Sequence, residues 1–220
     1  MYRRLLVGLG LAGFAAGPVA AQEFEIGPRL GYVKWKEETG LENSGMLGVD
    51  ALYKISRRIG IGARFDVSRP GTDNQYFSAE MTFGDTTLIF AVQQPLTVLQ
   101  YGLLAQVETG GSFSIFANGG AGARTITLDP QSARGRVSTT EWAFSAGGGL
   151  RIRSGGGTSV LLQVQDLIYP NFARNDLDPV EPRFAPKRFP DVIPVQADFD
   201  GTAHNIYASI SFIFTPGGAR

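Results

Sequence analysis

Residues 202–214, which read TAHNIYASISFIF, alternate between two faces. One face carries Ile206, Ala208, Ile210, Phe212 and Phe214, and the other carries Asn205, Tyr207, Ser209 and Ser211. A period of two is that of a β-strand which separates an apolar phase from a polar one. The stretch therefore predicts a strand whose apolar face lies against either a protein core or lipid.

The first 21 residues predict a cleaved export signal. Arg3 and Arg4 precede an almost uninterrupted apolar run over 5–16, and small residues follow at 18–21, where a signal peptidase would cut. The alternative is a buried N-terminal helix. The expected organisation is a signal over 1–21, one β-domain over 22–214 and a short tail over 215–220.

Composition excludes several classes of protein. The chain has no cysteine and one histidine, so a disulfide framework, a cysteine-based metal site and a histidine cluster are impossible. The formal net charge of zero gives no electrostatic reason to expect nucleic acid. No later run reaches 18 apolar residues, so no transmembrane helix is expected. We expect no cofactor and no metal, and the mature chain is either a periplasmic β-protein or an outer-membrane barrel.

Seven further segments alternate like the last one. They cover residues 24–36, 47–55, 59–67, 98–108, 113–125, 142–152 and 159–169. The connections alternate in length: those at 56–58, 109–112 and 154–156 are short, and those at 37–45, 69–97, 126–141 and 170–201 are long. Short turns on one rim and long loops on the other are typical of a transmembrane barrel with both termini on the periplasmic side. The predicted fold is all-β, an antiparallel up-and-down transmembrane β-barrel of eight strands.

The stretch 76–93 leaves a ten-stranded barrel as an alternative. It contains two strand-like runs around Gly84-Asp85, which is a hairpin signal. The runs either extend the third and fourth strands above the membrane or add two strands to the barrel. Eight strands are favoured because Glu80 and Asp85 fit poorly at membrane depth.

The face opposite the apolar one carries charges. The predicted lumen charges are Arg29, Asp50, Lys54, Arg64, Asp66, Glu108, Arg124 and Arg151. The interior of an eight-stranded barrel is just wide enough for side chains to fill it. Because an unpaired buried charge is costly, these groups are expected to pair and to plug the lumen. The alternative is a small passive channel for small solutes.

Two short motifs and the chain end resemble those of the small eight-stranded bacterial outer-membrane barrels, the OmpA-like and OmpW-like group. Ala203-His204-Asn205 stands where members of the group have a Thr-His-Asn triplet, and 166–169 resembles an Arg-Asp-Tyr element. Phe214 resembles the aromatic end of a closing strand that the barrel assembly machinery reads. The resemblance implies an outer-membrane location, a monomer, and contact with outer-membrane lipid and lipopolysaccharide. It assigns a closing-strand signal to Tyr207, Phe212 and Phe214, and a strand-end motif to His204, Asn205 and Asp166.

No catalytic residue is predicted. A lipid-modifying enzyme would need a serine and a carboxylate at His204, and Ser209 lies five residues along the strand, roughly 16 Å away. The alternative is that His204 and Asn205 cap the upper end of the closing strand. In the long loop over 170–201, a calcium site built from Asn175, Asp176, Asp178, Asp198 and Asp200 is an open alternative. The Pro-rich part of that loop would contact lipopolysaccharide or a partner, or cover the barrel mouth. The sequence favours a structural or surface-interaction role.

Overall fold

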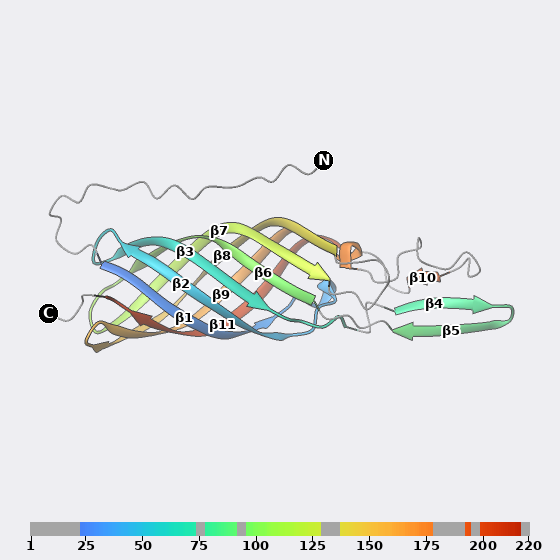
Figure 1. The fold of residues 1–220 in the computed structure, drawn as a ribbon, viewed down its shortest axis with the longest axis horizontal. Helices are drawn as coiled ribbons and strands as arrows, with labels where there is room; N and C mark the ends of the chain where they lie inside the picture. Colours follow the sequence, from blue (N-terminus) through green and yellow to red (C-terminus); the bar gives the residue numbers. More distant parts are fainter. Residues whose placement is uncertain are drawn as a thin grey trace.

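The chain forms a closed antiparallel barrel of eight strands (Figure 1). The computed structural model describes residues 23–73, 78–91, 96–128, 137–177, 192–194 and 199–216. The barrel strands are β1 (Glu23–Lys34), β2 (Ser44–Lys54), β3 (Ile59–Ser68), β6 (Leu96–Glu108), β7 (Phe113–Leu128), β8 (Val137–Gly155), β9 (Thr158–Ala173) and β11 (Asp200–Phe214). Each strand pairs with its neighbours in the chain's own order, and β1 pairs with β11 to close the ring. The predicted fold class is confirmed.

The register fixes the tilt of the strands. We can start at Lys34 on β1 and step from each residue to its paired residue on the next strand. The steps pass through Ile206, Asp166, Ala146, Gly119, Ala105, Ile61 and Tyr53. They return to β1 at Phe24, which is ten residues from Lys34. A displacement of ten residues over eight strands tilts each strand by about 40° from the barrel axis. At that tilt a strand of 12 residues such as β1 rises about 30 Å, which is enough to cross a hydrocarbon layer.

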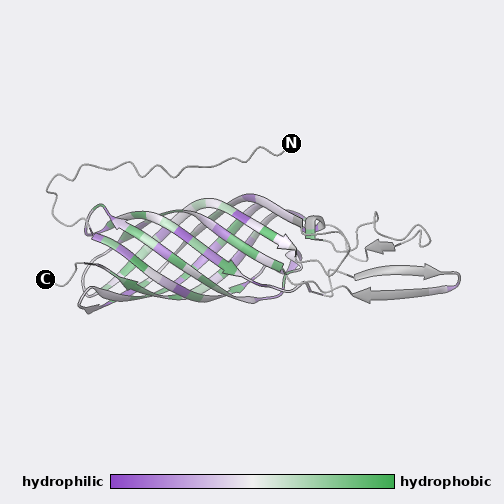
Figure 2. Cartoon of the chain, in the orientation of Figure 1, coloured by the Kyte–Doolittle hydropathy of each residue, from purple (hydrophilic) through white to green (hydrophobic). Residues whose placement is uncertain are grey.

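The outer wall is apolar. Figure 2 shows hydrophobic and hydrophilic residues alternating along the barrel strands, and the large exposed side chains on these strands are almost all hydrophobic. Outward aromatic residues lie near both ends of the barrel: Phe24, Tyr53, Phe113 and Phe214 toward the short-turn rim, and Tyr32, Tyr101, Trp142 and Phe144 toward the other. Two aromatic girdles around an apolar band are the pattern of a barrel in a lipid bilayer.

The two rims differ in their connections. At one rim, β2 joins β3 through residues 55–58, β6 joins β7 through 109–112, and β8 joins β9 through 156–157. Gly155, Gly156 and Gly157 all have positive φ, a conformation that side-chain-bearing residues rarely adopt, so this tight turn needs glycine. The strand ends Glu23 and Phe214 lie at this same rim, which we call the short-turn rim. The opposite rim, the long-loop rim, carries the short 3-10 helices η1 (Glu37–Thr39) and η2 (Arg174–Leu177).

The predicted hairpin lies outside the barrel. Strands β4 (Ser78–Phe83) and β5 (Thr86–Ala91) pair with each other, and β4 also pairs with β10 (Val192–Pro194). These strands form a separate sheet beyond the long-loop rim (Figure 1). The eight-strand count is therefore correct, but the prediction that these runs extend the third and fourth strands is wrong.

Several strands are longer than predicted. β8 begins at Val137 and β9 ends at Ala173, so parts of the predicted loops 126–141 and 170–201 are strand. The extra β7–β8 ladder carries cross-strand hydroxyl pairs such as Thr125 with Thr140, whose Oγ1 atoms lie 2.8 Å apart. Where both faces are polar there is no hydrophobic alternation to detect. The predicted signal at 1–21 and residues 217–220 of the tail lie outside the described residues.

Among the residues that the structure describes, no helix is long and apolar enough to span a membrane.

Candidate functional site

The interior of the barrel contains a set of buried charged side chains. All eight charges predicted to face the lumen are buried there. Glycines on the inner face make room for them and for the aromatic side chains. A Cβ at Gly48 would overlap the Asp66 carboxylate, and one at Gly31 would overlap the Tyr207 ring. Glycine is therefore needed at these inward-facing positions, because a larger residue would overlap the side chains that fill the lumen.

A network of two cations and two carboxylates lies at mid-barrel. Arg29 pairs with Asp66 and lies 3.5 Å from Asp50, and the Arg64 Nε donates to Asp50 Oδ1 at 2.8 Å. Arg29 also lies under the Tyr207 ring, 5.1 Å from its centroid. Every charge in this network therefore has an opposite charge beside it.

This network reaches across the lumen. Arg64 on β3 donates to Gln165 on β9, and these two strands lie on opposite walls of the ring. The Gln165 Nε2 then donates to Asn118 Oδ1 on β7 at 2.6 Å. Side chains from three walls meet at this level.

A second network lies near the short-turn rim. Arg151 on β8 donates two hydrogen bonds to Glu25 on β1, at 2.6 and 2.8 Å. Glu108 lies 3.0 Å from Lys54 Nζ and 3.2 Å from Arg151 Nε, and it also accepts from Arg153. Bidentate guanidinium–carboxylate pairs of this kind are among the stronger hydrogen bonds in proteins.

Toward the long-loop rim the lumen contains an ion pair stacked on aromatic rings. Arg124 pairs with Glu141 and stacks on two rings, 4.6 Å from the centroid of Tyr169 and 4.7 Å from that of Phe172. The Tyr169 hydroxyl donates to Gln100 Oε1 at 3.0 Å, across the barrel from β9 to β6.

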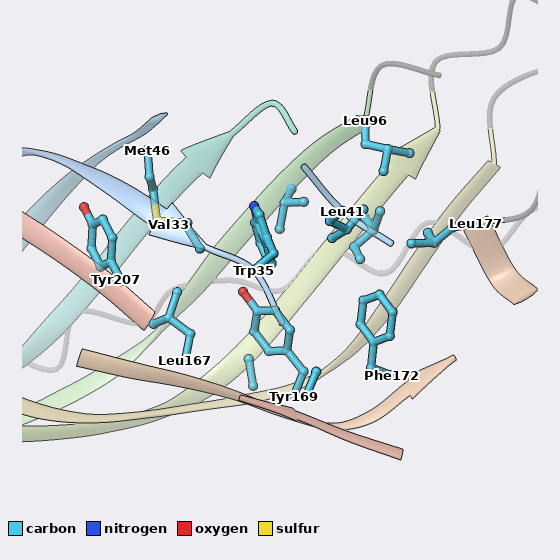
Figure 3. Close-up of a cluster of buried hydrophobic side chains, with 14 residues drawn as sticks. Val33, Trp35, Leu41, Met46, Leu96, Leu167, Tyr169, Phe172, Leu177 and Tyr207 are labelled. Carbon is cyan, nitrogen blue, oxygen red and sulfur yellow. The ribbon is translucent and has the colours of Figure 1, made fainter. Parts of the chain in front are cut away.

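Around Tyr169 a cluster of buried apolar side chains fills part of the lumen (Figure 3). Trp35 lies against the Tyr169 ring with 6.0 Å between centroids, and Leu41 and Leu177 close the cluster from the segments that leave β1 and β9. The remaining labelled members are Val33, Met46, Leu96, Leu167, Phe172 and Tyr207. Apolar side chains therefore fill the lumen at this rim beside the Arg124–Glu141 pair.

Two carboxylates complete the interior and were missing from the predicted set. The eight predicted charges comprise five cations and three carboxylates. Glu25, the partner of Arg151, and Glu141, the partner of Arg124, bring the carboxylates to five. Both residues alternate with the outward-facing residues of their strands and so point into the lumen. The excess of predicted cations over predicted carboxylates was the signal that could have revealed them.

Free space is distributed unevenly. A cavity beside Arg64 and Gln100 has a volume of about 10 Å³, which holds at most about one water. At the short-turn rim a hollow of about 770 Å³ is lined by residues that include Lys54, Glu108 and Arg153. The hollow is a vestibule lined by charged side chains at this end of the barrel.

The residues of the predicted strand-end motif lie on both sides of the barrel wall. The Asn205 side chain is buried, accepts from the Lys36 backbone N–H at 2.9 Å and donates to the Leu167 carbonyl at 3.1 Å. His204 and Asp166 lie on the outer wall, where His204 Nδ1 and Asp166 Oδ2 are 2.7 Å apart. The motif thus joins β11 to β9 and to the segment that follows β1.

The aromatic residues of the predicted closing-strand signal also lie on both sides of the wall. Tyr207 is fully buried in the lumen, whereas Phe212 and Phe214 are half-exposed on the outer wall. Ser209 belongs to the inner parity, opposite to the wall that carries His204, so the strand does not bring them together.

Other predicted features lie outside the described part of the chain. Of the calcium alternative, Asp178 and Asp198 fall outside it, as does the Pro-rich part of the loop over 178–191. Within the described residues, no group of three or more metal-ligating side chains is placed to hold a metal ion.

Comparison with known proteins gives the family. The sequence matches the outer membrane protein beta-barrel domain over residues 6–212. The chain belongs to this family. It is an outer-membrane β-barrel protein, so the short-turn rim is periplasmic and the long-loop rim extracellular. No curated protein matches it in sequence.

Among solved structures, Neisserial surface protein A has the same fold, and two others are less similar. Neisserial surface protein A is 9% identical, with a TM-score of 0.55, and the match covers 87% of this chain and 96% of that one. OprG from Pseudomonas aeruginosa is 13% identical with a TM-score of 0.46, covering 89% and 96%. Ail from Yersinia pestis, in complex with the heparin analogue sucrose octasulfate, is 12% identical with a TM-score of 0.43, covering 88% and 97%.

Proposed function

We propose that this protein is an outer-membrane barrel with a structural or surface-interaction role and a lumen closed to solutes. The observation that carries the proposal is the mid-barrel network of Arg29, Asp50, Arg64 and Asp66, extended to the opposite wall by Gln165. The ion pairs and hydrogen bonds of this network hold the side chains that fill the lumen.

A passing ion would have to displace these groups. Opening the network leaves charges without partners in a narrow bore, which is strongly unfavourable. A solute would then have to cross the apolar cluster around Trp35 and Tyr169. Both obstacles lie in series, which favours a closed lumen over a small passive channel.

Conductance recording tests the proposal. The mature barrel reconstituted in planar bilayers is expected to give no steady current, under conditions in which a general porin gives stable steps. Stable open levels in most reconstitutions would overturn the closed-lumen proposal and favour the channel.

The sheet of β4, β5 and β10 supports a surface role. It lies beyond the extracellular rim (Figure 1), and β5 has no partner on its second edge among the described strands. A free strand edge can pair with an extended segment of another protein. We propose lipopolysaccharide and the barrel assembly machinery as further partners, and the monomer as the working state.

We propose no enzymatic role. A catalytic histidine needs a nucleophile or a positioned water as well as an orienting group. Asp166 orients His204, but Ser209 belongs to the inner face.

A further inference from the structure

The vestibule at the short-turn rim carries a net positive charge. The cations that line it are Lys54, Arg57, Arg58, Arg151 and Arg153. The carboxylates that line it are Glu23, Glu25 and Glu108. Five cations against three carboxylates leave a charge of +2 at neutral pH. Four of the cations are arginines, which stay protonated, so the charge is positive whatever the state of the lysine.

The deeper cations already use two of the three carboxylates. Glu25 accepts both of its hydrogen bonds from Arg151. Glu108 is shared by Lys54, Arg151 and Arg153. Lys54 is buried, its Nζ lies 3.0 Å from Glu108 Oε1, and none of its three N–H donors has another acceptor among the described residues. The buried part of the vestibule therefore keeps donors that an anion could use.

Two arginines stand free at the mouth. Arg57 and Arg58 are exposed, and their guanidinium groups make no hydrogen bond or ion pair with any described residue. The turn that carries them is nevertheless fixed. Ser56 Oγ accepts from the Arg58 backbone N–H at 3.3 Å, and the Arg58 carbonyl accepts from the Glu108 backbone N–H at 2.8 Å. The backbone of this turn is thus tied to β6, while two planar forks of donors remain for a ligand.

The rest of the lining is hydrophilic. None of the described residues around the vestibule has an apolar or aromatic side chain. Apart from the charged residues and glycines, the lining consists of hydroxyl groups, on Ser56, Thr109, Ser112, Thr158, Ser159 and Thr215. Hydroxyl groups both donate and accept hydrogen bonds, so they suit a ligand that carries hydroxyls itself. The volume of about 770 Å³ lies in the range of sites that bind small molecules.

We propose that the vestibule binds a soluble phosphate monoester of a hydroxylated molecule, such as a sugar phosphate, from the periplasmic side. A phosphate monoester carries a charge of about −1.5 to −2 at neutral pH, which matches the +2 of the lining. Arg57 and Arg58 hold the phosphate by charge-assisted hydrogen bonds, and Lys54 adds a deeper cation. A phospholipid head group has the same phosphate chemistry, but its acyl chains would find no apolar wall in the vestibule.

Isothermal titration calorimetry tests the proposal. The mature barrel is refolded in detergent and titrated with glucose 6-phosphate as the probe. Saturable binding is expected, and it should weaken as salt is raised, because the charges at the mouth are exposed and screened. Glucose should not bind, and inorganic phosphate should bind more weakly than the ester because it cannot reach the hydroxyl groups of the wall.

Arg57→Gln and Arg58→Gln identify the site. Each should weaken the binding of glucose 6-phosphate about tenfold, which corresponds to losing one charged hydrogen bond. Both variants should fold like the wild type, since the turn is held by Ser56 and by backbone groups, and a heat-modifiable gel shift checks this. Arg69→Gln is the matched control. Arg69 is an exposed arginine that follows β3 at the opposite rim, so its loss removes the same charge and should leave the affinity unchanged.

A second titration separates the soluble ligand from a lipid head group. The barrel is placed in nanodiscs of phosphatidylcholine, with or without phosphatidylglycerol, and the affinity for glucose 6-phosphate should be the same in both. Its loss with phosphatidylglycerol would assign the vestibule to head groups and overturn the proposal. The proposal would also be overturned by absent saturable binding, by equal affinity for glucose or inorganic phosphate, by unchanged affinity in both Arg57→Gln and Arg58→Gln, or by an equal loss in Arg69→Gln.

Discussion

Asp66→Asn tests whether the mid-barrel network holds the barrel together. The side chains of Arg29 and Asp66 are 0% and 1% exposed, and removing one partner of such a pair costs about 3–5 kcal/mol. Arg29 keeps Asp50 at 3.5 Å, but Asp50 then serves Arg64 as well. We therefore expect a loss at the lower end, about 3 kcal/mol in the free energy of unfolding.

Urea unfolding of the refolded barrel measures this loss. Trp35 lies in the apolar cluster and reports its opening through fluorescence. With a denaturant dependence of about 1–3 kcal/mol per molar, the midpoint should fall by about 1–3 M. The double variant Arg29→Gln/Asp66→Asn should be more stable than Asp66→Asn, because no cation is then left without its partner.

A surface pair supplies the control. Lys36 and Glu38 lie 3.6 Å apart with side chains 31% and 52% exposed, so Glu38→Gln should cost less than about 1 kcal/mol. If Asp66→Asn costs no more than Glu38→Gln, the interior pairs do not stabilise the barrel and the reasoning above is wrong.

Three further predictions concern assembly and packing. Phe214→Ala should lower the yield of inserted barrel in cells more than Phe212→Ala does, although both are half-exposed on the same face; equal yields on quantitative blots of outer membranes would remove the special role of the terminal position. Gly31→Val should block folding, because the new side chain overlaps Tyr207; a normal heat-modifiable gel shift would contradict this. Replacing Ser78–Ala91 with a short Gly-Ser turn should leave the urea midpoint within error of the wild type, since that sheet is separate from the barrel; a lower midpoint would show that it supports the rim.

The sequence contained most of the barrel because the membrane imposes a simple rule. Where lipid faces one side and side chains pack on the other, alternation is strict, as in β11 with Phe212 outside and Ser211 inside. Outside the bilayer that rule is lost. The early part of β8 around Thr140 has polar residues on both faces, so its strand was predicted as loop.

The sequence indicates which side chains face the lumen more readily than which of them pair with one another. The alternation indicated that Arg151 faces inward, but its partner Glu25 is 126 positions away in sequence. That contact depends on the shear of the barrel, which no local pattern contains. The same holds for His204 and Asp166, which become neighbours only through the register of β11 against β9.

The closure of the ring also has a kinetic consequence. Lys34 and Ile206 are paired although nearly the whole barrel sequence lies between them, and Glu25 and Arg151 belong to strands on well-separated parts of the ring. Contacts this distant along the chain are slow to form, because loop closure must precede any gain from pairing. We expect the interior charges to stay hydrated until the first and last strands meet. We therefore expect folding to be slow and all-or-none, with strand-deleted fragments gaining none of the interior's stability.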